Sequence, residues 1–203
     1  MSGVLQIYGD RISGNCLKVL YTAQYVGRDF VWRDVDVLKR ESRTEEFLRL
    51  SPVGQVPIVV TEDGRVLAQS NAIIGWLAEG SALIPADPFE RAKMYEWLFW
   101  EQYSHEPLIA VRRFQKLYLK KTDDQIDPDL LPKGNAALAL MDRHLSDRAF
   151  FVGGGLTLAD IALLAYTRLA HEGGFDLNDF PNVRAWVARC ETALNISSAR
   201  EAA

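Results

Sequence analysis

The sequence predicts two parts: an α/β domain with a mixed four-stranded sheet, then an all-α helical domain. Three observations support this prediction. Short β-rich segments alternate with segments of helical periodicity over residues 1–79. Residues 80–88 contain two prolines and are typical of a linker. From residue 89 to residue 203 the pattern is almost wholly helical.

The first domain begins with a strand–helix–strand unit. Alternating or β-rich residues predict strands over residues 4–8 and 30–37, and apolar spacing predicts helices over residues 14–26 and 43–50. The first two strands are joined through a helix, so we expect them to be parallel with a right-handed crossover.

A hairpin follows, and it opens at a proline. Val56-Pro57 precedes an apolar run at 58–60, a turn signal at 62–65 and a second run at 66–68. Proline is tolerated at the first residue of a strand, and X-Pro is the common place for a cis bond. A cis bond would turn the backbone N–H and C=O of Val56 toward a ligand, whereas a trans bond is an ordinary turn. A helix from Ser70 to about residue 79 then completes the domain.

The second domain is predicted to open with one long helical segment, residues 89–120. Pro107 should kink it or break it near Glu106, because proline cannot donate the helical hydrogen bond. Its buried face is expected to carry Met94, Trp97, Leu98, Glu101, Leu108, Val111 and Leu117. Further helices are predicted over residues 129–146, 157–172 and 182–194.

One helix start is unusually clear. Thr157-Leu158-Ala159-Asp160 is a capping box with Asp in place of the usual Glu. Leu156 and Ile161 occupy the positions of a hydrophobic staple. The helix that follows is almost entirely apolar, so we expect it to be buried at the centre of the helical domain.

Composition excludes several classes of function. The net charge of −4 argues against nucleic-acid binding, and the densest basic group is typical of a solvated helix face: Arg112, Arg113, Lys116, Lys120 and Lys121. Cys16, Cys190 and three histidines form no metal-ligand or disulfide pattern, so we expect no metal site and a reducing, cytoplasmic location. No apolar run is long enough to span a membrane, and no signal peptide is expected at the N-terminus.

Four segments together, in this order and spacing, resemble the cytosolic, bacterial-type glutathione S-transferases over nearly the whole chain. They are Ser13-Gly14-Asn15-Cys16-Leu17-Lys18-Val19, Ser51-Pro52-Val53-Gly54-Gln55-Val56-Pro57, Gln69-Ser70-Asn71-Ala72-Ile73 and Leu156-Thr157-Leu158-Ala159-Asp160. The resemblance implies a thioredoxin-like domain that binds glutathione, a helical domain that supplies most of a hydrophobic pocket, and a homodimer. It also favours the cis isomer. The family usually has Glu-Ser where this chain has Gln69-Ser70, which removes one charge.

The resemblance implies a set of glutathione contacts. Ser70 stands at a helix N-terminus, where free N–H groups and the helix dipole favour an anion, so it suits the γ-glutamyl carboxylate. The alternative for Ser70 is an ordinary helix cap. The remaining predicted contacts are the backbone of Val56 with Pro57 for the cysteinyl part, Gln69 beside Ser70, and Gln55 and Lys39 for the glycine carboxylate.

Three residues compete as the activator of the thiol. Ser13 falls where serine-type members carry their catalytic hydroxyl, and its alternative is a helix cap. Cys16 occupies the place of the cysteine in cysteine-type members, and its alternative is a small buried hydrophobic residue. Asn15 is the third candidate, because some bacterial relatives with disulfide-reductase activity use a Thr or Ser and an Asn at the positions of Ser13 and Asn15. Tyr8 is a minor further candidate.

The second substrate is predicted to lie against Ile12, Tyr103, His105 and Arg112. A buried hydrogen-bond network explains the polar stretch 103–107 equally well. The leading function is conjugation of glutathione, as the co-substrate, to a small hydrophobic electrophile, as in detoxification. The alternatives are a glutathione-dependent disulfide oxidoreductase or peroxidase, and a non-catalytic glutathione- or ligand-binding protein.

Overall fold

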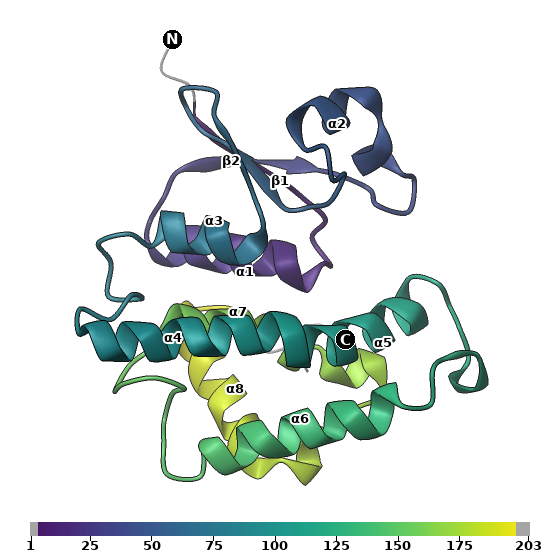
Figure 1. Cartoon of the computed structure of the whole chain (residues 1–203), viewed down its shortest axis with the longest axis vertical. Helices are drawn as coiled ribbons and strands as arrows, with labels where there is room; N and C mark the ends of the chain where they lie inside the picture. The colour runs from purple at the N-terminus through teal and green to yellow at the C-terminus, as the bar shows by residue number, and fades with distance from the viewer. Residues whose placement is uncertain (1–3, 198–203) are drawn as a thin grey trace. The chain divides into compact units, whose positions relative to one another are not determined.

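A computed structural model describes residues 4–197 of the chain (Figure 1). The chain divides into two units, Met1–Ser81 and Ala82–Ala203, which are treated separately below. The ends of the predicted domain ranges, residues 1–3 and 198–203, lie outside the described residues.

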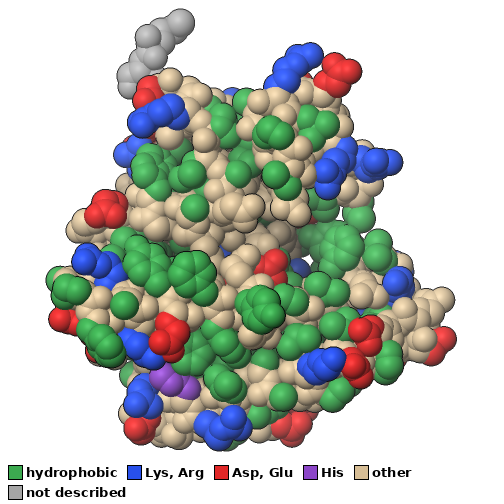
Figure 2. All heavy atoms as spheres, in the orientation of Figure 1, with side chains coloured by type: hydrophobic (Ala, Val, Ile, Leu, Met, Phe, Trp, Pro, Cys, Tyr) green, Lys and Arg blue, Asp and Glu red, His purple; other side chains and the backbone are tan. Residues whose placement is uncertain are grey.

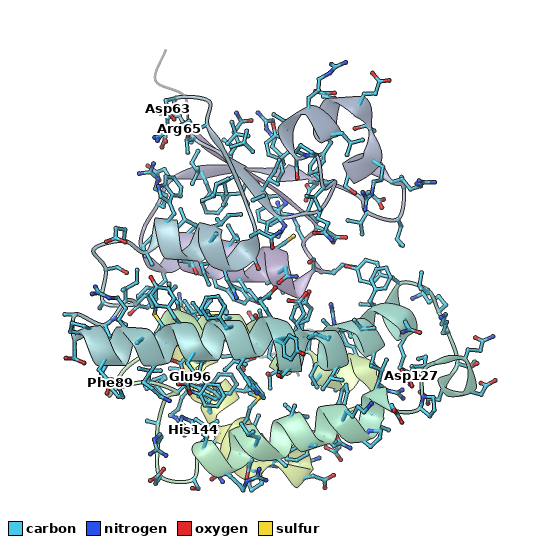
Figure 3. The ribbon with its side chains drawn as sticks, viewed as in Figure 1. Asp63, Arg65, Phe89, Glu96, Asp127 and His144 are labelled. Carbon is cyan, nitrogen blue, oxygen red and sulfur yellow. The ribbon has the colours of Figure 1, made fainter. Side chains whose placement is uncertain are left out.

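The sheet of the first unit has the order β2-β1-β3-β4. β1 (Leu5–Gly9) pairs in parallel with β2 (Phe30–Asp34) and antiparallel with β3 (Ile58–Val60), which pairs antiparallel with β4 (Val66–Ala68). The predicted mixed four-stranded sheet is therefore confirmed. The β3–β4 hairpin has Asp63 and Arg65 side by side at its tip, joined by an ion pair of 2.8 Å (Figure 3).

Helices cover both faces of this sheet. α1 (Gly14–Tyr25) and α3 (Ser70–Leu77) run side by side from the same end, and α2 (Glu45–Leu50), preceded by the short 3-10 turn η1 (Glu41–Arg43), lies on the other face (Figure 1). The pleat of β1 explains this arrangement, because successive side chains point to opposite faces. Leu5, Ile7 and Gly9 are buried, whereas Tyr8 packs edge-on against Phe47 of α2.

The second unit is built from five α-helices and a π-helical turn within the described residues. They are α4 (Pro88–Trp100), the π turn η2 (Glu101–His105), α5 (Glu106–Leu117), α6 (Leu130–His144), α7 (Leu158–Thr167) and α8 (Pro181–Leu194). Short 3-10 turns join them: η3 (Asp123–Gln125), η4 (Ala170–Gly173) and η5 (Leu177–Asp179). Every residue of α7 is buried, which confirms the expected central helix. No helix among residues 4–197 is long and apolar enough to cross a membrane.

The break predicted near Glu106 is a π-helical turn, and it changes which side chains of α5 are buried. The expected buried face included Leu108 and Val111, but the structure buries Ile109 and Arg112, and Val111 is 41% exposed. Pro107 has no amide hydrogen, so the turn before it widens and takes in an extra residue. The buried stripe is consequently displaced by one position along the chain.

Two of the five basic residues, Arg112 and Arg113, do not lie on the solvated face that composition suggested, whereas Lys120 is exposed. Arg112 donates from Nε to the carbonyl oxygen of Gly173 at 2.7 Å and from Nη2 to Asp123 at 2.5 Å. Arg113 donates to Glu172 at 2.5 Å. Both guanidinium groups are buried, and these contacts attach α5 to η3 and η4.

The predicted capping box at the start of α7 is present. Asp160 Oδ2 accepts hydrogen bonds from both the backbone N–H and the hydroxyl of Thr157, each at 2.9 Å. Its other oxygen accepts from the backbone N–H of Phe151 and from Nε1 of Trp186, also at 2.9 Å. Burial raises the pKa of the Asp160 carboxyl group, and these four donors oppose that rise.

Gly134 of α6 allows a close approach of a side chain to the helix backbone. A Cβ at this position would lie 2.6 Å from Cζ of Phe175 and closer still to Cε1. Phe175 is buried and has little room to move, so we expect Gly134→Ala to lower the free energy of unfolding by roughly 1–3 kcal/mol. Chemical denaturation measures the change.

Gly75 of α3 is the matched control, because it is also a helical glycine but a Cβ placed on it would meet no atom within 4 Å. Gly75→Ala should raise the free energy of unfolding by roughly 0.4–1 kcal/mol, since alanine loses less backbone entropy on folding. Equal effects of the two substitutions would contradict the steric explanation.

Candidate functional site

The loop after β1 delivers Ser13 to the start of α1. Asp10 organises this loop, because its side chain accepts from the Ile12 N–H at 3.0 Å and its carbonyl oxygen accepts from the Ser13 N–H at 3.1 Å. Within the described residues, the Ser13 side chain makes no capping hydrogen bond, although Ser13 holds the N-cap position. The hydroxyl is half-buried. The Ser13 side chain therefore does not cap the helix, which was the alternative role predicted for this serine.

Cys16, in the first turn of α1, is completely buried. Burial raises the pKa of its thiol to about 12, although hydrogen bonds with the Ser13 side chain and the Asp10 N–H act in the opposite direction. The Asp10 N–H lies 3.4 Å from the sulfur. The Cys16 side chain is consequently a neutral thiol at physiological pH, and its environment is that of a packing residue.

Ser70 and Asn15 bring the first turns of α3 and α1 into contact. Ser70 is the first residue of α3 and is buried, and its hydroxyl donates to Oδ1 of Asn15 at 3.0 Å. Two positions 55 residues apart in sequence therefore share one hydrogen bond. The sequence motifs gave no sign of this contact, because each motif was local to its own helix.

Gln69 precedes Ser70 in a backbone conformation that is rare for a residue with a side chain. Its φ is 72° and its ψ is 112°, outside the left-handed helical region, and its side chain is exposed. Residues held in such regions cost about 1–3 kcal/mol and concentrate at functional sites. The geometry holds the first N–H groups of α3 in a fixed position next to Ser70.

The strain at Gln69 can be separated from the role of its side chain. We expect Gln69→Gly to raise the free energy of unfolding by about 1 kcal/mol, because glycine adopts positive φ without steric cost. Gln69→Ala, the matched variant, keeps the strain and loses only the amide, so it should leave stability within about 0.5 kcal/mol. Chemical denaturation of both variants measures this, and a Gly variant no more stable than the Ala variant would contradict it.

The Val56–Pro57 peptide bond is cis, as expected. β3 begins only at Ile58, so Val56 stands just before the paired strands. Its side chain is half-buried against the cluster formed by Val35, Phe47 and Ile58, whereas Gln55 is exposed. Pro57 is buried.

Lys39 lies on the loop after β2 and is mostly exposed. Its ammonium group is 3.0 Å from Asp36, and this contact raises the pKa of Lys39. The pKa of Asp36 is lowered by the hydrogen bond from the backbone N–H of Lys39 and, next, by the ammonium group. The cation is therefore held near the loop backbone and stays charged across the physiological range.

The four residues predicted to contact a second substrate have different environments. Ile12 of the first unit and Tyr103 of the second are exposed, Tyr103 by 87%. His105 is completely buried and hydrogen-bonded to Thr167 at 3.0 Å, and Arg112 is bound to Gly173 and Asp123 as described above. The alternative explanation of the polar stretch was a buried hydrogen-bond network. The contacts of His105 and Arg112 agree with that explanation.

Several aromatic side chains of the second unit pack in its interior. The ring of His144 packs against Trp97 and Phe151, with centroids 4.7 Å and 5.3 Å away (Figure 3). Within residues 4–197, no three His, Cys, Asp or Glu side chains are grouped as metal ligands.

Family models match most of the chain. The model of the glutathione S-transferase N-terminal domain matches residues 12–79, and that of the C-terminal domain matches residues 97–193. These matches include Ser13, Asn15, Val56 and Ser70 in the first region and Tyr103 in the second.

Solved structures and curated proteins agree with the family models. A glutathione S-transferase from Pseudomonas fluorescens Pf-5 is 41% identical with a TM-score of 0.90, over 94% of this chain and 96% of that one. One from Xanthobacter autotrophicus Py2 is 42% identical with a TM-score of 0.87, over 92% of each chain. The mouse (Mus musculus) protein glutathione S-transferase theta-2 is 29% identical over 98% of this chain and 85% of its own length.

Proposed function

Because the chain belongs to the glutathione S-transferase family, we propose that it binds glutathione as a thiolate and conjugates it to a small hydrophobic electrophile. The observation that carries this proposal is the half-buried hydroxyl of Ser13 at the start of α1, which does not cap its helix among the residues described. In the structure this hydroxyl is hydrogen-bonded with the Cys16 side chain, and we propose that it donates to the sulfur of glutathione when the ligand is bound.

Ser13 is assigned the role of thiol activator. A hydrogen bond from a hydroxyl to a thiolate is charge-assisted and contributes about 1.5–3 kcal/mol, which corresponds to roughly one to two pKa units. A free thiol has a pKa of about 8.5, so this stabilisation, helped by the N-terminus of α1, leaves much of the bound thiol ionised at neutral pH. The thiolate is the nucleophile, and binding holds it close to the electrophile.

The other residues of the first unit are assigned to the rest of the tripeptide. The Ser70 hydroxyl and the first N–H groups of α3 donate to the γ-glutamyl carboxylate, with Gln69 beside them. The backbone of Val56 pairs with the cysteinyl part in the manner of a β-strand, next to Pro57. Lys39, whose charge is secured by Asp36, and the exposed Gln55 are assigned to the glycine carboxylate.

Within the first unit, the electrophile is assigned to the exposed apolar side chain of Ile12. The polar groups of His105 and Arg112 are bound within the second unit, so neither is assigned to the electrophile.

The second candidate function is that of a glutathione-dependent disulfide oxidoreductase or peroxidase. The position of Asn15 is the observation that favours it. Its side chain is half-buried, two residues beyond Ser13, and it is oriented by the hydroxyl of Ser70. Cys16 does not support a mixed disulfide with glutathione, because its sulfur is buried and protonated.

One binding measurement and two activity assays test the proposal. Calorimetry on the purified protein should detect glutathione binding, and a chlorodinitrobenzene-type aryl halide should be conjugated. Turnover of hydroxyethyl disulfide without conjugation of the aryl halide would show that the protein is an oxidoreductase and not a transferase. Binding without either activity would indicate a ligand-binding protein, and no binding at millimolar glutathione would overturn the proposal.

We extend the proposal to a cytoplasmic homodimer. Large aromatic side chains are exposed along α4 and the π turn: Phe89, Tyr95, Phe99 and Tyr103, with exposures of 71%, 44%, 73% and 87%. Apolar side chains are visible over this helix in Figure 2. An exposed apolar stripe of this kind suits a second copy of the chain, and light scattering should give twice the mass of one chain. Both cysteines are free thiols, which suits a reducing compartment.

A further inference from the structure

The loop that carries Ser13 is attached to the end of β2 by an arginine that has no part in the proposed function. Arg11 lies in this loop, and its Nε donates to Oδ1 of Asp34 at 3.0 Å. The same oxygen accepts from Nε1 of Trp32 at 2.8 Å, and the Arg11 guanidinium lies over the Trp32 ring, 5.1 Å from its centroid. Each of the three side chains therefore contacts the other two. We call Arg11, Trp32 and Asp34 the Arg11 clamp.

The Trp32 ring also lies close against the backbone at the end of β1. A Cβ on Gly9 would come within 2.9 Å of Cζ2 and Cη2 of this ring, and within 3.1 Å of Cβ of Cys16. The carbonyl oxygen of Gly9 accepts a hydrogen bond from the Val35 N–H at 3.0 Å, which joins the two strand ends. Because Gly9 has no side chain, the ring can pack here, and it gives Arg11 a fixed platform beside the first turn of α1.

The path from Arg11 to Ser13 is short and ordered. Only Ile12 separates them, and Asp10 bonds to the N–H groups of Ile12 and Ser13 at 3.0 Å and 3.1 Å. A shift of Arg11 is therefore passed through one turn to the backbone of Ser13, which determines where the hydroxyl points. Such a shift matters, because a misplacement of about 1 Å can cost roughly 100-fold in rate.

Solvent exposure limits the strength of the clamp. The side chains of Arg11 and Asp34 are 60% and 72% exposed, and an isolated ion pair of this kind is weak because water and salt screen it. The clamp is more than an isolated pair, since one carboxylate oxygen receives two donors and the ring holds the guanidinium from a third direction. We therefore expect a moderate effect on Ser13, smaller than removal of its hydroxyl.

We propose that Arg11 is a positioning residue for Ser13. Through Asp34 and Trp32 it holds the loop between β1 and α1 in the conformation from which the Ser13 hydroxyl donates to the thiolate of bound glutathione. Arg11 is assigned no contact with glutathione or the electrophile, so its whole effect passes through Ser13. This inference rests on the proposed function.

Arg11→Ala tests the proposal through the pH profile of aryl halide conjugation. We expect kcat/KM at neutral pH to fall about threefold to tenfold, and the inflection of the profile to move up by roughly half a unit to one unit. The KM for glutathione should stay within about twofold. A residue that only stabilised the fold would reduce the amount of active protein and leave the inflection unchanged.

A double variant shows whether the effect passes through Ser13. If it does, adding Arg11→Ala to Ser13→Ala should cause no further loss of kcat/KM and no further shift of the inflection, because the hydroxyl to be positioned is absent. Two losses that simply add would show that Arg11 acts independently of Ser13.

Two single substitutions serve as controls. Arg11→Lys keeps a cation beside Asp34 and over the ring, so its inflection should lie between those of the wild-type protein and Arg11→Ala. Arg65→Ala breaks a similar exposed ion pair, with Asp63 at 2.8 Å (Figure 3). The antiparallel pairing of β1 with β3 places that hairpin tip at the opposite end of β1 from Arg11, so the pH profile should not change. Thermal unfolding confirms that each variant is folded.

The inference and the proposed function fail in different ways. An unchanged inflection in Arg11→Ala, or losses that add in the double variant, would overturn the role of Arg11 while leaving that of Ser13 intact. An unchanged inflection in Ser13→Ala would overturn the role of Ser13 in the proposed function, and with it the positioning role of Arg11.

Discussion

Ser13→Ala is expected to lower kcat/KM for conjugation of an aryl halide by roughly 10–100-fold at neutral pH. The substitution removes the hydroxyl that donates to the thiolate, and the lost stabilisation of about 1.5–3 kcal/mol raises the thiol pKa by roughly one to two units. Below that pKa, each unit reduces the thiolate fraction tenfold. The pH profile of kcat/KM measures this change as a shift of its inflection to higher pH, and the two enzymes should converge above the raised pKa.

Cys16→Ala is the matched control, because it removes another polar atom from the same turn of α1. Cys16 is buried and its thiol is protonated at neutral pH, so conjugation should stay within about twofold of the wild-type rate, with a modest loss of stability from the small cavity. The assignment of Ser13 would be wrong if Cys16→Ala abolished conjugation while Ser13→Ala preserved it.

Asp160→Ala is expected to be the most destabilising of the substitutions considered. It leaves four buried donors without their acceptor: the N–H groups of Phe151 and Thr157, the Thr157 hydroxyl, and Nε1 of Trp186. Each unpaired donor costs about 1–3 kcal/mol, partly offset because a buried carboxylate is also removed. We expect a net loss of roughly 3–4 kcal/mol, or about 10 °C in Tm, measured by thermal and chemical denaturation.

Asp87 provides a control for the burial of this carboxylate. It caps α4 by accepting from the N–H groups of Phe89 and Glu90 at 3.0 Å and 2.9 Å, but it is exposed to solvent. Water replaces its hydrogen bonds in Asp87→Ala, so the cost should be that of an ordinary helix cap, about 0.5–2 kcal/mol. Equal losses in the two variants would show that the buried network around Asp160 adds nothing beyond capping.

Local patterns were sufficient to predict most of the fold. The order of strands and helices and the capping box at Thr157 follow from residues close together in sequence, whereas the cis bond before Pro57 was favoured only by the family resemblance. The strand predicted over residues 30–37 ends at Asp34, at the point where the alternation of apolar residues changes phase. The two halves of that segment could not both face the core in one strand.

The buried side of α5 could not be predicted from periodicity. A regular α-helix advances about 3.6 residues per turn, and that spacing placed Leu108 and Val111 inside. Pro107 predicted a break near this point, but not that the wide turn at Glu101–His105 adds a residue, so Ile109 and Arg112 are buried instead. Arg112 and Arg113 were expected in solvent because their partners, Asp123 and Glu172, come from other segments of the chain.

The candidate site was predictable in its parts but not in their connections. The motifs identified Ser13, Val56 and Ser70 as candidates, and these remain predictions. The hydrogen bond from Ser70 to Asn15 joins two motifs that are far apart in sequence, so only the fold reveals it. The positive φ of Gln69 also had no sequence signal, since glutamine is not a residue that favours this conformation.

The order of strands in the first unit has a consequence for aggregation. β2 and β4 are the outer strands, and an outer strand offers unpaired backbone groups to any other chain. β4 spans only Val66–Ala68, too short to template a long intermolecular ladder. β2 is longer, but it ends in Arg33 and Asp34, which are charged and exposed. The short length of β4 and the charged end of β2 therefore protect both edges of the sheet against pairing with a strand from another chain.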